Sequence, residues 1–140
     1  MILRGFIAGI IATVILSAIM MMKTMMGLMP EFNVISDWTS LLATVGVSAG
    51  PAIAWILHFA LGGVWGVLFA LIHHKLPGGY VVSGIIFGVI AWLGMMVGFM
   101  PIAGNGFFAL SISPMVPMAT LILHVIFGAV LGFSYSKLVR

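Results

Sequence analysis

Two histidines lie at the same position of two matching apolar segments. His58 is in "ILHFALGGVWG", residues 56–66, and His124 is in "ILHVIFGAVLG", residues 122–132, so both segments read I-L-H-x-x-x-G-x-x-x-G. An ionisable side chain within a membrane span is costly, and it usually faces the bundle interior and marks function. Imidazoles from two helices can hold a haem iron from both sides. The pair therefore predicts a haem b site formed by His58 and His124, in a protein that carries electrons.

The glycines that follow each histidine fit two interpretations. Gly62, Gly66, Gly128 and Gly132 would let a porphyrin lie against the helix backbone, so we assign them to the cofactor site. However, Gly-x-x-x-Gly is also the usual close-packing face of membrane helices. If the second and fourth spans touched through these glycines, a porphyrin would not fit between them. Each histidine would then bond to a neighbouring polar group, such as Thr13, Ser17 or Thr120, and the protein would be a ligand-free subunit.

Methionines support an alternative metal site. Of the twelve methionines, all except Met1 fall in the half of the molecule that we expect to face outside. Thioether sulfur is a soft ligand that suits Cu(I), and imidazole also binds copper. A copper-handling site would combine His58 and His124 with four methionines: Met21, Met25, Met96 and Met100. The alternative is that the methionines fill gaps in an apolar core.

The remaining polar residues do not form a catalytic arrangement. Glu31 and Asp37 are the only carboxylates, and both fall in one loop outside the spans. His73, His74 and Lys75 end a span and indicate an interfacial cluster. We therefore expect no enzyme.

Composition and apolar runs predict an all-α membrane protein. The 140 residues are 64% hydrophobic and 5% charged, against about 25% charged in soluble domains. Four apolar segments are long enough to cross a bilayer as helices: residues 2–22, 52–72, 81–100 and 115–135. Basic residues at both termini and around Lys75 predict that both termini are cytoplasmic. The scattered basic residues do not indicate nucleic-acid binding.

The spans form two similar hairpins, residues 1–75 and 76–140. "GIIATV", residues 9–14, matches "GIIFGV", residues 84–89, and the same alignment places Met20 on Met95 and Met21 on Met96. Hairpins that enter the membrane in the same direction predict a pseudo-twofold axis along the membrane normal. The loop of residues 30–51 should contain a short surface helix over about residues 36–45, capped by Ser36 or Asp37.

Several stretches resemble a family of small bacterial membrane proteins of unknown function. They are "AGIIATVILSAIMMMKTMMGLMPE", "AWILHFALGG", "MPIAGNGFFAL" and "PMATLILHVIFGAVLG". The resemblance implies a four-helix protein of the bacterial inner membrane, and it implies no activity. The lipid bilayer is the expected surrounding. Because small residues favour helix association, we also expect a homo-oligomer or a place in a larger membrane complex.

Overall fold

The structure is a computed structural model that describes all residues, 1–140, and it is helical throughout with no strand. The order of elements is α1 (Ile2–Met25), α2 (Val34–Thr44), α3 (Pro51–Ile72), η1 (His73–Lys75), α4 (Tyr80–Gly94), η2 (Met95–Phe99), α5 (Met100–Ile102), η3 (Phe107–Ala109) and α6 (Met115–Leu138). Four stretches are long and apolar enough to span a membrane: α1, α3 with η1, α4 through α5, and α6. The all-α prediction is confirmed.

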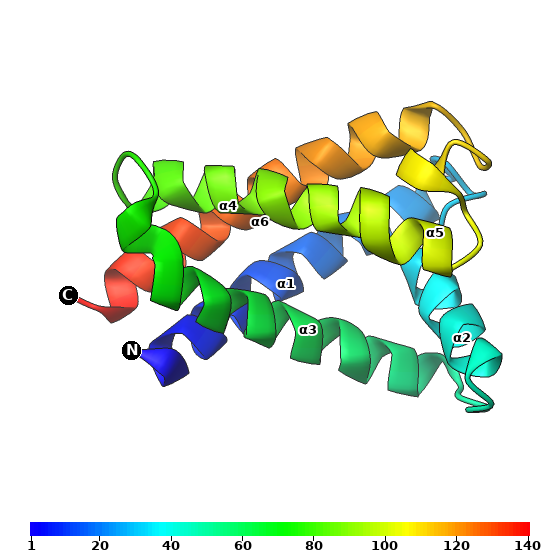
Figure 1. Cartoon of the computed structure of the whole chain (residues 1–140), viewed down its shortest axis with the longest axis horizontal. Helices are drawn as coiled ribbons and strands as arrows, with labels where there is room; N and C mark the ends of the chain where they lie inside the picture. The colour runs from blue at the N-terminus through cyan, green and yellow to red at the C-terminus, as the bar shows by residue number, and fades with distance from the viewer.

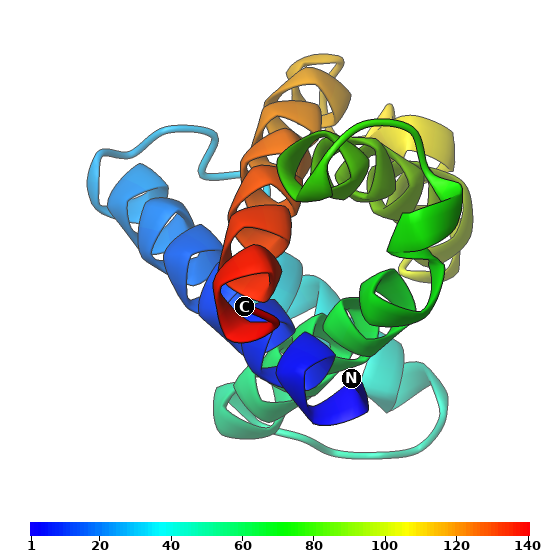
Figure 2. The ribbon, with the colours of Figure 1, turned by 90° about the vertical axis from the view of Figure 1, so that its left-hand side faces the viewer.

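The four long helices form two tightly packed pairs. α1 packs along α3, α4 packs along α6, and α1 with α6 joins the pairs (Figure 1). α3 and α4 share few contacts, which include packing of the Trp65 and Phe69 rings of α3 against the Phe87 ring of α4. Both termini lie at one end of the bundle, which we call the terminal end, and α2 lies at the other, the α2 end (Figures 1 and 2).

Glycines allow the close approach within each pair. A Cβ added to Gly9 of α1 would collide with the backbone of Gly62 and Gly66 in α3. A Cβ added to Gly84 of α4 would collide in the same way with Gly128 and Gly132 in α6. Glycines that permit backbone contact are typical of membrane helix interfaces. Gly9 and Gly84 are the two positions that the sequence match aligns, whereas the repeat itself and its pseudo-twofold axis stay predictions.

The surface helix α2 begins earlier than the sequence analysis predicts. Its cap is Asn33, whose side-chain oxygen accepts hydrogen bonds from the backbone N–H groups of Ile35 (3.0 Å) and Ser36 (3.3 Å). The prediction that Ser36 or Asp37 caps the helix is therefore wrong, because both lie inside its first turn. An Asn side chain satisfies the free N–H groups of a first turn as well as Ser or Asp does.

Hydrophobic and hydrogen-bonded contacts connect α2 to the second hairpin. The ring of Trp38 lies 4.9 Å from that of Phe99 in η2. The side-chain amide of Asn105, in the segment after α5, donates a 3.0 Å hydrogen bond to Asp37. These contacts hold α2 across one end of the bundle, where it covers the space between the two hairpins (Figure 1).

Candidate functional site

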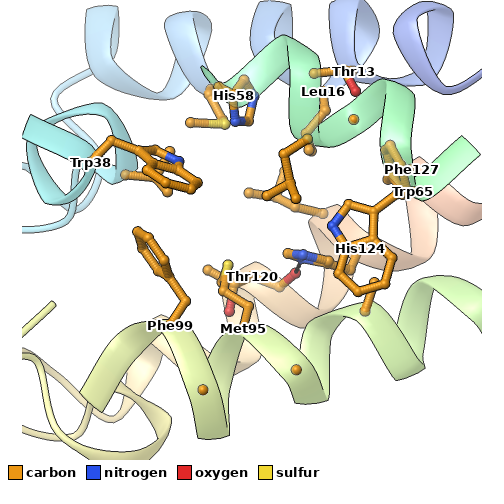
Figure 3. A pocket seen from close by; sticks show the side chains of 18 of the residues that line it. Thr13, Leu16, Trp38, His58, Trp65, Met95, Phe99, Thr120, His124 and Phe127 are labelled. Carbon is orange, nitrogen blue, oxygen red and sulfur yellow. Dashed lines mark hydrogen bonds between the residues drawn. The ribbon is translucent and has the colours of Figure 1, made fainter. Parts of the chain in front are cut away.

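The two histidines of the matching segments line one internal cavity of about 440 Å³, within the range of small-molecule sites. His58 lies on the α3 wall and His124 on the opposite, α6 wall (Figure 3). Side chains of α1, α2 and α4 complete the lining, and aromatic rings are prominent among them: Phe32, Trp38, Trp65, Phe99 and Phe127. The sequence prediction that both imidazoles face a shared space agrees with this arrangement.

The imidazole of His124 is oriented by its own helix. Its Nδ1 lies 2.8 Å from the backbone carbonyl oxygen of Thr120, one turn earlier. A carbonyl can only accept, so Nδ1 carries the proton and Nε2 keeps a free lone pair. A ring N–H bonded to a backbone carbonyl is the usual support of a metal-ligating histidine.

The imidazole of His58 has a buried nitrogen without a partner. Its Nε2 is inaccessible to solvent and makes no hydrogen bond within the chain. Trp55 packs edge-on against the ring with centroids 5.7 Å apart, and Phe59 does so at 5.9 Å. Because an unpaired polar atom is costly to bury, this nitrogen is a candidate contact for a bound ligand. Thr13, which the sequence analysis offered as a partner, makes no hydrogen bond to this nitrogen, and its hydroxyl donates to the Gly9 carbonyl within α1.

The glycines assigned to the site serve mainly to pack the helices. Of the four glycines assigned to the site, Gly62 lines the cavity, whereas Gly66, Gly128 and Gly132 do not. All four are packed against α1 or α4, and α3 does not contact α6 through them. The alternative in which the second and fourth spans close on each other through glycines is therefore wrong.

Two other glycines face the cavity. Gly94 and Gly98 line it, and a Cβ added to either would meet no atom within 4 Å. Neither glycine is needed for helix packing, so each leaves bare backbone beside an empty space. Gly94 caps and Gly98 lies within a π-helical turn, η2, and such turns occur frequently at functional sites. The two glycines form a stretch of cavity wall without side chains, and any larger residue at either position would extend into the cavity.

The methionines of the predicted copper site are not brought together. Met21 and Met25 project outward at the end of α1 and are 56% and 85% exposed, whereas Met96 and Met100 are fully buried beneath the loop that follows α5. None of these four lines the cavity. Met20 and Met95 line it instead, and they are one of the two methionine pairs that the sequence match aligns; the other pair, Met21 and Met96, does not line it.

Ionisable groups are scarce around the cavity. No Lys, Arg, Asp or Glu lines it, and the chain has no cluster of three or more His, Cys, Asp or Glu side chains placed to hold a metal ion. His73 and His74 lie at the terminal end beside Tyr80, around a separate hollow of about 160 Å³. The wall chemistry suits binding of an apolar ligand through a few nitrogen atoms, and it offers no acid–base pair.

Asp37 lies outside the spans, at the α2 end. Burial raises the pKa of its carboxyl above its ordinary value, and the hydrogen bond from Asn105 partly opposes this effect. Its Oδ2 is buried without a partner. Asp37 belongs to the contact that holds α2, because its other oxygen accepts the hydrogen bond from Asn105. The next residue, Trp38, forms part of the cavity wall.

Sequence reasoning missed the residues that shape the cavity. Trp65 and Phe99 are ordinary apolar residues in the sequence, and only the arrangement of the helices places them there. Gly94 and Gly98 carried a usable signal, since they fall outside the packing positions that the repeat aligns with Gly9. Met20 and Met95 carried no such signal, because the same alignment pairs Met21 with Met96.

The comparisons with known proteins give a family and no assigned role. Residues 1–140 match the model of a family described as a family of unknown function (DUF6789), and the chain belongs to this family. No curated protein and no solved structure matches the chain.

Proposed function

We propose that this member of a family without an established function binds haem b in the cavity between its hairpins and carries electrons within a membrane. The observation that carries the proposal is the placement of His58 and His124 on opposite walls of one apolar cavity (Figure 3). When bound through two imidazoles, haem iron takes up and returns one electron, and the axial ligands help to set its potential.

The residues present fit this cofactor in three respects. His124 is held in the tautomer that leaves Nε2 free to bind iron, and His58 has a buried nitrogen without a partner. Gly94 and Gly98 leave backbone open to a flat ring. Apolar and aromatic walls exclude water, which is how a protein tunes a haem potential.

The α2 end offers a cation for the haem carboxylates. Lys23 Nζ donates to the carbonyl oxygens of Met29 (2.9 Å) and Phe32 (2.7 Å), and Phe32 is part of the cavity wall. A positive charge beside this wall suits a ligand with two acidic groups on one edge.

An absorption spectrum tests the proposal. Protein purified in mild detergent from haem-replete cells should be red, with a Soret band and the sharp visible bands of a six-coordinate haem after reduction. His58→Ala and His124→Ala should each lose the low-spin spectrum, whereas His74→Ala, at the terminal end, should keep it. A colourless preparation that also fails to take up added haem would contradict the proposal.

A copper site is the second candidate, and the observation that favours it is the presence of Met20 and Met95 in the same cavity as the two histidines. Two thioethers and two imidazoles form a soft donor set suited to Cu(I). These methionines replace Met21, Met25, Met96 and Met100 as the expected ligands.

Metal analysis separates the two candidates. A copper site predicts that the protein retains copper after loading with Cu(I) and desalting, and that a Met20→Leu/Met95→Leu variant loses it. The Met21→Leu/Met25→Leu variant is the matched control and should retain the metal, because both side chains point away from the cavity. Haem binding predicts that both double variants keep the Soret band.

A further inference from the structure

Three sides of the cavity are closed by packed protein. At the α2 end, Trp38 lies against Phe99 and Asp37 is hydrogen-bonded to Asn105. Toward the terminal end, a core of fully buried side chains fills the bundle, with Phe69 and Leu131 at 0% exposure. On the side opposite α3 and α4, α1 packs directly against α6. Water therefore has no open path to the two imidazoles from these directions.

The fourth side is the gap between α3 and α4. These helices touch near Trp65, Phe69 and Phe87 and then diverge toward the α2 end (Figure 1). The cavity lies in this wedge, since α3 supplies His58 and Leu61 to one wall and α4 with η2 supplies Gly94 and Gly98 to the other. Leu61 is 38% exposed although it lines the cavity, so the gap reaches the outside of the bundle.

The outside of the bundle at this depth is hydrocarbon. Both α3 and α4 belong to stretches long and apolar enough to cross a membrane, and their outward side chains, such as Val64 and Ile90, are exposed and apolar. An opening between two membrane-spanning helices faces acyl chains rather than water.

We infer that the cavity opens sideways into the bilayer between α3 and α4, and that its ligand is a lipid-soluble molecule that reaches His58 and His124 from the acyl-chain region. The sideways opening does not depend on the proposed function. Only the identity of the ligand, haem b, rests on it. A flat apolar ring would slide along the bare backbone of Gly94 and Gly98, where a side chain would narrow the gap. The small residues on this wall thus have a role that helix packing does not require of them.

Quenching of tryptophan fluorescence by brominated acyl chains tests the opening without any cofactor. The chain is reduced to one tryptophan, Trp65, which lines the cavity, by replacing Trp38, Trp55 and Trp92 with Phe. It is then reconstituted in phosphatidylcholine vesicles with or without bromine on the acyl chains. Trp65 should be strongly quenched, because acyl chains enter the wedge beside it.

Two phenylalanine substitutions in the same turn provide the contrast. Gly98→Phe should remove most of the quenching of Trp65, since the new ring has open space in the cavity. Val97→Phe is the matched control and should leave the quenching unchanged, because Val97 is 48% exposed and does not line the cavity. If the single-tryptophan protein does not fold, the wild type and Trp65→Phe are compared instead. The part of the wild-type quenching that is lost in Trp65→Phe is the quenching of Trp65.

The outcomes separate this inference from the haem proposal. Equal quenching in the Gly98→Phe and Val97→Phe variants, or no quenching of Trp65 at all, would overturn the sideways opening even if the protein is red. Strong quenching that Gly98→Phe removes would support the opening even if the protein is colourless. The haem spectrum and the lipid measurement thus fail independently.

Discussion

The two histidines differ in how their rings are fixed. His124 is held by the Thr120 carbonyl at 2.8 Å, whereas His58 is positioned by ring contacts with Trp55 and Phe59. A hydrogen bond sets the tautomer of an imidazole, while edge-on packing sets only its plane. His124 is therefore the preformed contact of the site, and His58 is the one that adjusts when a ligand binds.

Asp37 is the residue that should make the stability of the α2 contact depend on pH. Its pKa is raised in the folded protein, chiefly by burial, so the fold favours the protonated carboxyl. The protein should therefore be destabilised as pH rises from the ordinary value near 3.8 through the raised pKa. Below the ordinary value this loss should be absent.

Comparison of the wild type with Asp37→Asn measures the effect. The amide keeps an oxygen that can accept from Asn105 and removes the charge. Thermal unfolding in detergent should give a higher Tm for Asp37→Asn at about pH 7, and the difference should shrink toward about pH 4, where the wild-type carboxyl gains its proton. Asn105→Ala should lower the Tm at both pH values, because it leaves the buried Asp37 without its donor. A lower Tm for Asp37→Asn at neutral pH would show instead that the charge is stabilising.

At the scale of helices, the glycines perform two separate tasks. Gly84 and Gly128 bring α4 and α6 into backbone contact, whereas Gly94, on the same helix as Gly84, faces open space in the cavity. Replacing a glycine in α4 should therefore lower or raise the free energy of unfolding, depending on whether that glycine packs against α6 or faces the cavity.

Alanine substitution should separate the two tasks. Gly128→Ala places a Cβ against the Gly84 carbonyl, and forced overpacking of this kind costs about 1–3 kcal/mol. Gly94→Ala meets no atom, and the better helix propensity of Ala should stabilise the protein by up to about 1 kcal/mol. Reversible unfolding in mixed detergent gives both values. A Gly128→Ala variant as stable as the wild type would mean that α4 and α6 are not in backbone contact.

The sequence was sufficient to predict the four spans, because they depend on local apolar runs, and an internal match suggested that the histidines share a site. It could not predict which neighbouring helix the glycines of α3 and α6 contact. Gly62 and Gly128 follow the same pattern whether they face each other or face α1 and α4, and only three-dimensional packing decides between these arrangements. The choice of methionines failed for the same reason, since a one-residue step from Met20 to Met21 turns a side chain from the cavity to the outside.

At the scale of the whole molecule, the glycines that could have joined two copies are used within one chain. Gly9, Gly62, Gly84 and Gly128 are occupied by contacts between α1 and α3 or between α4 and α6. Self-association and docking to a larger complex stay predictions, and they would need other surfaces. Substituting Gly62 or Gly128 by leucine should therefore disrupt the fold itself, so it cannot serve as a test of assembly.

The two ends of the bundle carry different charges, which predicts how the protein lies in its membrane. Arg4, Lys75, Lys137 and Arg140 belong to the termini and to the η1 turn, which share one end. The α2 end has Lys23 with both carboxylates, Glu31 and Asp37. Basic residues in short loops remain on the cytoplasmic side, so the terminal end should be cytoplasmic and α2 should face outside.

Single cysteines report this orientation directly, because the chain has no cysteine of its own. Ser40→Cys, on the exposed side of α2, should react with a membrane-impermeant maleimide in intact cells. Lys75→Cys, an exposed position in η1, should react only after the membrane is opened. The reverse pattern would place α2 in the cytoplasm, and labelling of both positions in intact cells would show that the four helices do not cross the membrane as a bundle. If α2 faces outside, Trp38 and the Asp37–Asn105 contact form the outward cover of the cavity, and a ligand that reaches the imidazoles from lipid lies nearer the outer leaflet than the cytoplasmic one.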